Sequence, residues 1–220
     1  MIIDESIAPE YSKIQSVFKR DENTHRFIEN KFSLPEFDYL KKNNWWMTEK
    51  VHGTNTRVAW DGRMVRFAGK TNDAQISQKL FWKLQETFTN KKFCGLYPDT
   101  PMCLYGESYG ASINSGGNYI RGGVDFVLFD VLIDGWWLRR EGIEDVANKL
   151  DIDFVPLVGK TTLLDAVEMI RRKTLKSCWG DFLAEGVVLK PEVEMKTRRG
   201  DRIITKLKHK DFRRDNKRNV

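Results

Sequence analysis

Residues 48–68 read TEKVHGTNTRVAWDGRMVRFA, and the side-chain pattern of this stretch predicts a β-hairpin. Apolar side chains alternate with polar or small ones along residues 56–60 and again along residues 65–68. Asp61-Gly62 separates the two runs and indicates a two-residue turn, in which both positions need positive φ. Lys50 then lies at the entrance to the hairpin, just before a glycine-containing turn.

The same periodicities predict the remaining elements. Helical spacing of apolar residues indicates helices over 36–42, 77–88 with Ser77 as N-cap, 141–150 and 162–172. Strands are expected over 102–107, 126–133, 136–138, 186–190 and 202–208, with Asp134-Gly135 as a second hairpin turn. Strands dominate without regular strand–helix alternation. This favours an α+β fold of mainly antiparallel sheets flanked by helices.

Length and composition bound the class of protein. The chain has 220 residues, 40% apolar and 31% charged, and no long linker or repeat, so we expect one domain over residues 1–220. No apolar run approaches the roughly 18 residues that span a bilayer, and residues 1–10 do not resemble a signal peptide. Three scattered cysteines indicate reduced thiols in a cytoplasmic protein: Cys94, Cys103 and Cys178.

The net charge of +6 is unevenly placed. Residues 196–220 hold eleven Lys or Arg against three Asp, a local balance of +8, so the other 195 residues sum to −2. A basic terminal segment on a near-neutral body indicates a polyanionic partner. A solvated tail would have the same composition, and charge alone leaves both readings open.

Two Gly-Lys-Thr triplets, at 69–71 and 159–161, invite interpretation as phosphate-binding P-loops. A P-loop also needs a glycine five residues before that of the triplet, so that backbone N–H groups can turn onto a phosphate. Those positions hold Met64 and Phe154. Both triplets are chance matches, and the sequence argues against a P-loop NTPase.

Carboxylates lie at the ends of two expected strands. Glu107 ends the strand that begins at residue 102, and Glu185 immediately precedes the strand at 186–190. Between them, residues 125–130 (DFVLFD) form an apolar strand with two aromatic side chains.

Along residues 202–208, strand alternation puts Ile203, Thr205 and Leu207 on one face and leaves two lysines on the other. Lys206 and Lys208 therefore project from a largely apolar strand. One reading is a structural ion pair with Glu107 or Glu185. The other is a cationic site for a phosphate.

In order and approximate spacing, these segments resemble the covalent nucleotidyltransferase superfamily of ATP-dependent polynucleotide ligases and RNA-capping enzymes. Lys50–Asn55 resembles the nucleophile motif KxxGxN of this superfamily. Five later segments resemble its later motifs, in the same order: Gly69–Thr71, Gly106-Glu107, Phe126–Asp130, Glu185–Lys190 and Lys206–Lys208. The motifs at residues 52–55 and 184–191 are most similar to those of the type 2 RNA ligases, the nick-sealing enzymes of phages and trypanosome editing. The resemblance runs from about Tyr11 to Lys210. It implies the ATP-grasp-like ligase adenylation fold.

The resemblance implies a role for each matching position. Lys50 would attack the α-phosphate of ATP, expel pyrophosphate and hold AMP as a phosphoramidate, after losing a proton with the help of nearby cations. Glu185 would bind Mg²⁺ or Mn²⁺, with Glu107 as a second expected metal ligand. The other expected contacts are Glu49 with the adenine edge, Phe129 with its ring, Glu107 with the ribose, Gly53 and Lys70 with the nucleotide, Lys206 and Lys208 with the α-phosphate, and Asn55 with the strand ends.

Two positions depart from the family pattern. The position of Lys70 is commonly Arg, whose two-pronged grip a lysine cannot reproduce. His52 occupies a slot that is Asp in many DNA ligases of the superfamily, and its role stays open. The 220 residues also hold no counterpart of the C-terminal OB-fold or helical domain of related ligases.

The implied activity is the joining of 3′-OH and 5′-phosphate ends in nicked duplexes, through lysyl-AMP and an adenylylated strand. We expect phosphate contacts from Arg198, Arg199, Arg202, Lys210, Arg213 and Arg214. We also expect a monomeric intracellular protein, encoded by a phage of a bacterial host. The glycine-rich loop 114–123 is either a surface turn or a cover over substrate. Alternatives are a DNA or DNA–RNA hybrid ligase, a catalytically inactive nucleic-acid-binding module and an RNA-capping guanylyltransferase.

Overall fold

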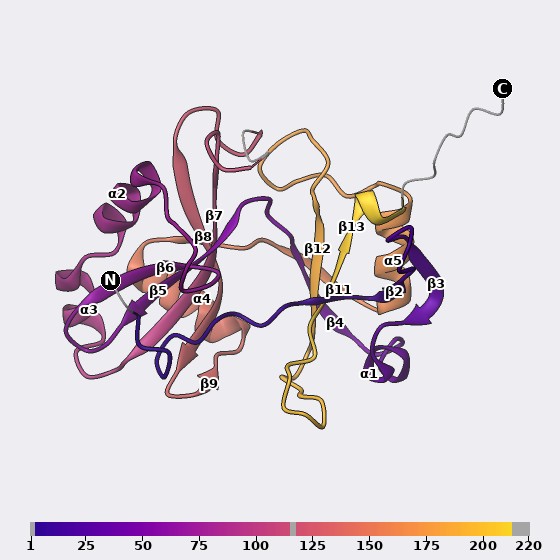
Figure 1. The fold of residues 1–220 in the computed structure, drawn as a ribbon, viewed down its shortest axis with the longest axis horizontal. Coiled ribbons are helices and arrows are strands. Elements are labelled where there is room, and N and C mark those ends of the chain that lie inside the picture. Colours follow the sequence, from indigo (N-terminus) through magenta and orange to yellow (C-terminus); the bar gives the residue numbers. More distant parts are fainter. Residues whose placement is uncertain (1–2, 115–117, 213–220) are drawn as a thin grey trace. The chain divides into compact units, whose positions relative to one another are not determined.

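The computed structural model describes residues 3–114 and 118–212, drawn in Figure 1. Its chain forms two compact units, each made of two segments. Unit 1 contains Met1–Ser12 and Val51–Val155, and unit 2 contains Lys13–Lys50 and Pro156–Val220. The chain thus passes from unit 2 to unit 1 directly after Lys50. The expectation of a single domain stays a prediction.

Unit 1 is built on a mainly antiparallel sheet with strand order β10-β8-β7-β5-β6, and β9 also pairs with β8. Its strands are β5 (Thr54–Trp60), β6 (Val65–Gly69), β7 (Met102–Gly110), β8 (Val124–Ile133), β9 (Trp136–Trp137) and β10 (Asp153–Phe154). Its helices are α2 (Gln78–Thr87), α3 (Asn90–Leu96) and α4 (Arg140–Leu150). The expected N-cap is confirmed, because Ser77 Oγ accepts a hydrogen bond from Leu80 N. Helix α3 was not predicted.

The two expected hairpins have different turns. Between β8 and β9, Ile133 faces Trp136 and the intervening Asp134 and Gly135 both have positive φ, 47° and 76°. That two-residue turn is confirmed. Between β5 and β6, Trp60 faces Val65, so four residues connect the strands. The predicted two-residue turn is wrong there: only Gly62 of the connection has positive φ, and Asp61 instead accepts two backbone hydrogen bonds from residues 63 and 64.

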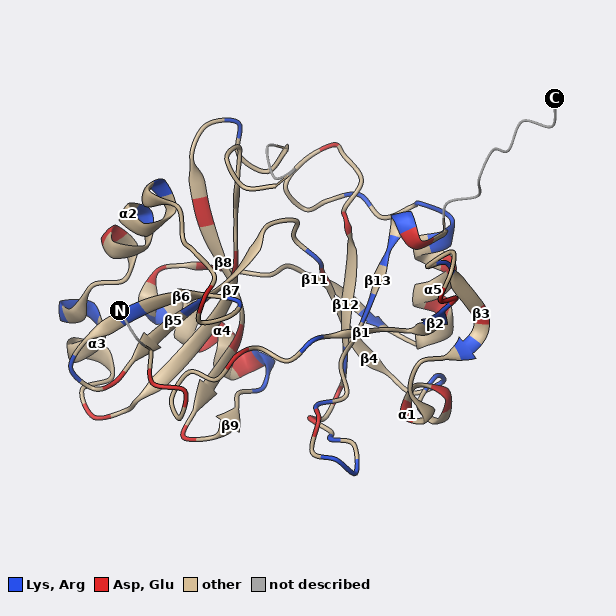
Figure 2. Ribbon diagram, in the orientation of Figure 1, with Lys and Arg blue, Asp and Glu red and all other residues tan. Residues whose placement is uncertain are grey.

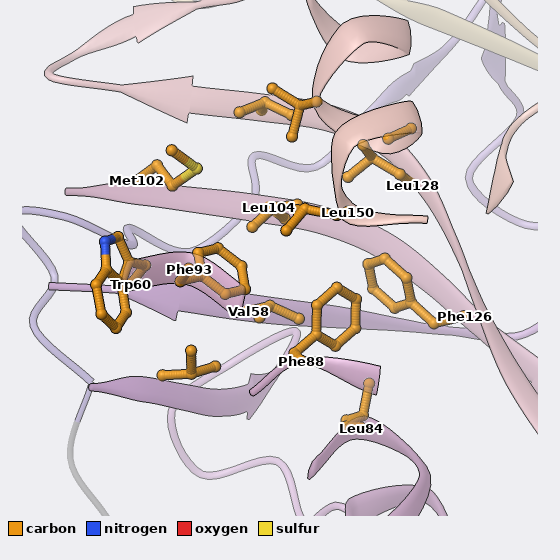
Figure 3. Packing of buried hydrophobic residues seen from close by; sticks show 14 of the residues in the cluster. Val58, Trp60, Leu84, Phe88, Phe93, Met102, Leu104, Phe126, Leu128 and Leu150 are labelled. Carbon is orange, nitrogen blue, oxygen red and sulfur yellow. The ribbon is translucent and has the colours of Figure 1, made fainter. Parts of the chain in front are cut away.

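The hydrophobic core of unit 1 lies between its sheet and its helices (Figure 3). Val58 and Leu104 come from adjacent strands, whereas Leu84 and Phe88 come from α2 and its end. All four are at most 2% exposed. At roughly 1.5–3 kcal/mol for each fully buried large apolar side chain, such contacts fix the sheet that carries the unit 1 site residues.

Unit 2 contains a five-stranded sheet with strand order β1-β13-β12-β4-β11 and a separate β2–β3 pair. Its strands are β1 (Gln15–Ser16), β2 (Phe18–Arg20), β3 (Phe27–Phe32), β4 (Trp45–Glu49), β11 (Leu157–Thr161), β12 (Gly186–Pro191) and β13 (Thr205–Lys208). Its helices are α1 (Pro35–Tyr39), α5 (Leu163–Arg171) and the 3₁₀ helix η2 (His209–Phe212). Most strand pairs are antiparallel, which confirms the α+β class; β1–β13 and β10–β8 are parallel.

The core of unit 2 confirms the predicted alternation along its last strand. Ile203 and Leu207 are buried in this core together with residues of α5, which packs against β13. The strand itself is shorter than predicted and begins at Thr205. Arg202 instead forms an antiparallel bridge with Lys196 inside the β12–β13 connection.

Helix α1 is also shorter than the predicted 36–42. All three cysteines are free thiols, as predicted. No helix within residues 3–114 and 118–212 is long and apolar enough to cross a membrane.

Candidate active site

The residues expected to act divide between the two units. In unit 2, Lys50 follows β4 and donates its backbone N–H to Gly186 O of the neighbouring strand, at 2.9 Å. Its side-chain Nζ donates to Glu185 Oε2 at 2.7 Å. Lys208 Nζ lies 2.5 Å from Glu185 Oε1. The fold therefore brings two predicted site lysines, far apart in sequence, onto the carboxylate of a third predicted site residue.

Strand pairing explains why these side chains meet. Strand β12 lies between β4 and β13, with Val187 opposite Glu49 and Gly186 opposite Lys208. A Cβ atom on Gly186 would lie 1.9 Å from Leu207 O, so only glycine permits this approach of the two strands. Glu185, the residue before Gly186, is thereby placed between the two lysines.

The cluster carries excess positive charge in a largely enclosed position. The side chains of Lys50 and Lys208 are each 19% exposed, and that of Glu185 is 13% exposed. Burial alone would raise the pKa of Glu185, but the charges and hydrogen bonds of Lys50 and Lys208 hold that pKa below its usual value. Two cations on one anion leave a net charge of +1, which suits a phosphate.

Lys206 lies on the same face of β13 as Lys208, as alternation predicts, and is half-buried. It pairs in register with Val188 on one side and with Ser16 on the other. The phosphate contact expected of it stays a prediction.

Glu49, next to Lys50, is buried and only 1% exposed. Its carboxylate accepts hydrogen bonds from Ser177 Oγ and Cys178 N, both at 2.7 Å. These bonds anchor the turn that leads toward Glu185. The turn is distant in sequence and was not predicted; the expected contact of Glu49 with adenine stays a prediction.

In unit 1, Glu107 holds the turn that follows Lys50. Its Oε1 accepts a hydrogen bond from Gly53 N at 3.0 Å, and Asn55 faces it in register across β5 and β7. A Cβ atom on Gly53 would lie 2.1 Å from Ser108 O, so the backbone approach requires glycine. Asn55 Oδ1 is buried without a hydrogen-bond partner among the described residues, which leaves it able to accept one from a ligand.

Phe129 lies where the pairing register between β7 and β8 shifts, a bulge that turns a side chain relative to the regular strand. Its ring packs edge-on against Tyr11, with centroids 5.2 Å apart. Tyr11 Oη in turn donates to Asp130 Oδ2 at 2.7 Å, and Asp130 is fully buried. No local pattern identified Tyr11 as a partner of this strand, because Tyr11 and Asp130 are 119 residues apart in the chain.

The glycine-rich loop also reaches the turn after Lys50. Tyr119 Oη accepts a hydrogen bond from His52 N at 3.2 Å, and Asn114 Nδ2 donates to Gly53 O at 2.7 Å. Closure of this loop over substrate stays a prediction. Lys70 follows β6 and is exposed to solvent.

The expected metal ligands are Glu185 in unit 2 and Glu107 in unit 1. Across residues 3–114 and 118–212, no group of three or more His, Cys, Asp or Glu side chains forms a cation site. Mg²⁺ commonly binds through one or two carboxylates together with substrate phosphates and water. Glu185 is ionised and partly accessible, so it fits that mode of binding. The described residues form no site in which protein groups alone would hold the cation.

The expected phosphate-contacting residues occupy different settings. Arg198, Arg199 and Lys210 are exposed. The guanidinium of Arg202 is held by Glu194, and its side chain is only 8% exposed. Arg213 and Arg214 lie outside the described residues.

Comparisons with known proteins show which family and which fold this chain shares. A family model described as RNA ligase matches residues 43–208, which include Lys50, Glu107, Glu185 and Lys208. No curated protein sequence gives a significant match.

Solved structures of Naegleria gruberi RNA ligase share the fold. A mutant in its apo form aligns with TM-score 0.70 and 16% identity, covering 96% of this chain and 58% of that one. A mutant with ATP and Mn gives TM-score 0.69 and 16% identity, covering 94% and 57%. The ligase with PPi gives 0.63 and 18%, covering 91% and 60%. The chain thus spans 57–60% of the length of these relatives.

Proposed function

Because the chain belongs to the RNA ligase family, we propose that it joins RNA ends at the expense of ATP, through an AMP carried on Lys50. The observation that carries this proposal is the cluster of Lys50, Glu185 and Lys208. It presents an amine and a second cation, each within hydrogen-bond distance of the same carboxylate. That set matches the needs of nucleotidyl transfer, which depends on positioning and on charge stabilisation.

In the first step, neutral Lys50 Nζ attacks the α-phosphorus of ATP after its proton has passed to solvent. A P–N bond forms, the bond from the α-phosphorus to the bridging oxygen breaks, and pyrophosphate leaves with the electron pair. Lys208 stabilises the charge that develops on the α-phosphate oxygens. The Naegleria ligase structures with ATP and Mn and with PPi support a nucleotide of this kind.

In the second step, a 5′-phosphate oxygen of an RNA strand attacks the phosphorus of the adenylylated lysine and releases Lys50. In the third, the 3′-OH of the other strand attacks that 5′-phosphorus, and AMP leaves. One ATP is thereby converted to AMP and pyrophosphate for each phosphodiester formed. We place the two ends in a nicked duplex, because the motif at residues 52–55 resembles that of the nick-sealing type 2 RNA ligases.

Glu185 would hold Mg²⁺ or Mn²⁺, which neutralises phosphate charge when bound. The unit 1 residues Glu107, Phe129 and Lys70 are assigned to the nucleotide and Asn55 to the strand ends, as the resemblance implies. The bond from Gly53 N to Glu107 Oε1 supports a place for this acid near the nucleophile's turn.

The test is joining of a labelled 5′-phosphate strand in nicked RNA, DNA and hybrid duplexes, with ATP and Mg²⁺. We expect product with RNA at the nick, none from a 5′-OH strand and none from Lys50→Ala. If only the DNA nick is joined, the substrate of the enzyme is DNA and not RNA. Transfer of GMP from GTP would indicate a capping enzyme, and RNA binding without any nucleotide adduct would indicate an inactive module.

A further inference from the structure

The connection between β12 and β13, residues 192–203, forms a second β-hairpin, here named the basic hairpin. Lys196 and Arg202 form an antiparallel bridge, and Thr197 N donates to Asp201 O at 2.7 Å. Gly200 N donates to Thr197 O at 2.9 Å, and Gly200 has φ +89°. A β-turn therefore closes the hairpin at residues 197–200, with two arginines at its centre.

The base of the basic hairpin is braced by ion pairs. Arg202 Nε and Nη2 lie 2.5 and 2.8 Å from the two carboxylate oxygens of Glu194, a bidentate contact. Glu192 pairs with Lys160 of β11. Ile203 N also donates to Met195 O at 2.9 Å. The hairpin is thus ordered before any partner arrives, which lowers the entropic cost of binding.

The braces separate the charges of the basic hairpin into two zones. Glu192 and Glu194 are matched by Lys160 and Arg202, so the base is neutral. The tip, residues 196–201, holds Lys196, Arg198 and Arg199 against Asp201, a net charge of +2. Within the described residues, no carboxylate forms an ion pair with Arg198 or Arg199, and both side chains are exposed. Arginines presented in this way suit bidentate contact with phosphate.

The basic hairpin leaves the end of β12 that is opposite to Glu185. Figure 1 shows this segment extending beyond the sheet of unit 2, and Figure 2 shows basic residues near its end. Six residues, Gly186–Pro191, separate Glu185 from its base. At about 3.3 Å per residue this separation is roughly 20 Å. Along one strand of a B-form DNA duplex, with about 3.4 Å per phosphate, that length corresponds to about six phosphates. An A-form RNA duplex has a shorter rise per nucleotide, so about six is the lower bound.

We infer that the tip of the basic hairpin, through Arg198 and Arg199, holds the phosphate backbone of the RNA duplex at least about six nucleotides from the ends being joined. This inference rests on the proposed function, because the reacting ends define the position of Lys50. The basic composition of residues 196–220 predicted contact with a polyanion, and the inference places that contact on the basic hairpin of unit 2. The two arginines bind and place the substrate but take no part in nucleotide transfer.

The test compares a double variant, Arg198→Ala with Arg199→Ala, with the natural chain. Its matched control is Arg63→Ala with Arg139→Ala, which removes two other exposed arginines and changes the net charge equally. On a nicked RNA duplex with arms of about twelve base pairs, we expect the double variant to bind at least about tenfold more weakly at low salt. The dependence of log Kd on log salt should become shallower by about two. The control should bind like the natural chain.

Arm length provides the second measurement. On duplexes whose arms have about four base pairs, the double variant and the natural chain should bind equally, because such arms do not reach the basic hairpin. Equal binding on long arms, or an equal deficit on short arms, would overturn the inference. Formation of the ATP-dependent adduct should be unchanged in the double variant. If the natural chain forms no adduct, the proposed function fails, whereas the binding data still decide the role of the hairpin.

Discussion

Lys50 Nζ lies 2.7 Å from Glu185 Oε2, so the amine proposed as nucleophile is ion-paired to the carboxylate proposed as metal ligand. Lys208 occupies the other oxygen of the same carboxylate. A nucleotide phosphate that enters this cluster competes with Glu185 for two cations. A divalent cation competes with the same two lysines for the carboxylate. Ligand binding is therefore expected to rearrange this trio of side chains.

The first prediction concerns stability and pH. Replacing Glu185 by Gln should lower the free energy of unfolding by about 1–3 kcal/mol near neutral pH, because two partly buried ammonium groups lose their carboxylate. The folded-state pKa of Glu185 is lowered. Its contribution is therefore full above its unfolded-state pKa of about 4.3 and is lost as the pH falls through the folded-state value.

Urea unfolding of both proteins at about pH 7 and at about pH 3 measures this effect. The difference between them should shrink at the lower pH. A matched control is Glu192→Gln, which breaks an ion pair whose side chains are 40% and 47% exposed and should cost about 0–1 kcal/mol. If Glu185→Gln lowers the free energy of unfolding by the same amount at both pH values, the ionised carboxylate of Glu185 is not the source of the stabilisation.

The second prediction concerns two glycines with opposite outcomes. Gly186→Ala should destabilise the protein by about 1–3 kcal/mol, since the new Cβ would meet Leu207 O at 1.9 Å. It should also slow adduct formation, because the strands that place Glu185 and Lys208 are forced apart. Gly95→Ala should stabilise the protein by about 0.5–1 kcal/mol, because nothing lies within 4 Å of its Cβ and the residue is helical. Thermal unfolding measures both, and a neutral Gly186→Ala would show that the strands can separate freely.

The third prediction concerns thiol reactivity. Burial, and then the hydrogen bond and charge of Glu49, raise the pKa of Cys178. Glu49→Gln should therefore lower that pKa and speed alkylation of Cys178 near pH 8, with the exposed Cys94 as internal reference. A shifted midpoint of the pH–rate profile distinguishes this effect from greater exposure, which raises only the plateau. Burial raises the pKa of Cys103 to about 12, so this thiol should stay unreactive in the folded protein.

The fourth prediction separates charge stabilisation from nucleophilic attack. Lys208→Met should lower the rate of adduct formation by about 10²–10³, the usual cost of removing one group that stabilises developing negative charge. Some adduct should still accumulate over long incubation, since Lys50 remains. Single-turnover kinetics with labelled ATP measure this rate. A rate within twofold of the natural chain would remove Lys208 from the proposed first step.

Regular elements with a clear local signal could be predicted from the sequence. The alternation along residues 202–208 correctly put Ile203 and Leu207 in the core, and the periodicity of 77–88 gave α2 with its Ser77 cap. The Asp61-Gly62 turn was predicted wrongly. A four-residue connection satisfies the same alternation, and the side chain of Asp61 stabilises it in a way that a turn dipeptide does not reveal.

Contacts between distant segments were predicted only in part. An ion pair of Lys208 with Glu185 was one of the two readings of the alternation along residues 202–208, and the structure contains this pair. That the same carboxylate also binds Lys50 was not predicted, because this depends on the strand order β4-β12-β13. The anchoring of Glu49 by Ser177 and of Phe129 by Tyr11 likewise follows from tertiary packing. The net charge of +8 over residues 196–220 indicated a polyanionic partner. It did not show which of these Lys and Arg side chains form ion pairs with Asp or Glu. The ion pair of Arg202 with Glu194 became visible only in the structure.

The most direct measurement is the intact mass of the protein after incubation with ATP and Mg²⁺, followed by mapping of the modified peptide. The account predicts a gain of one adenylyl group, attached to Lys50, acid-labile as a phosphoramidate, and reversed by added pyrophosphate. Lys50→Ala should show no gain in mass. An adduct on another residue, or one that persists in Lys50→Ala, would contradict the assignment of the nucleophile.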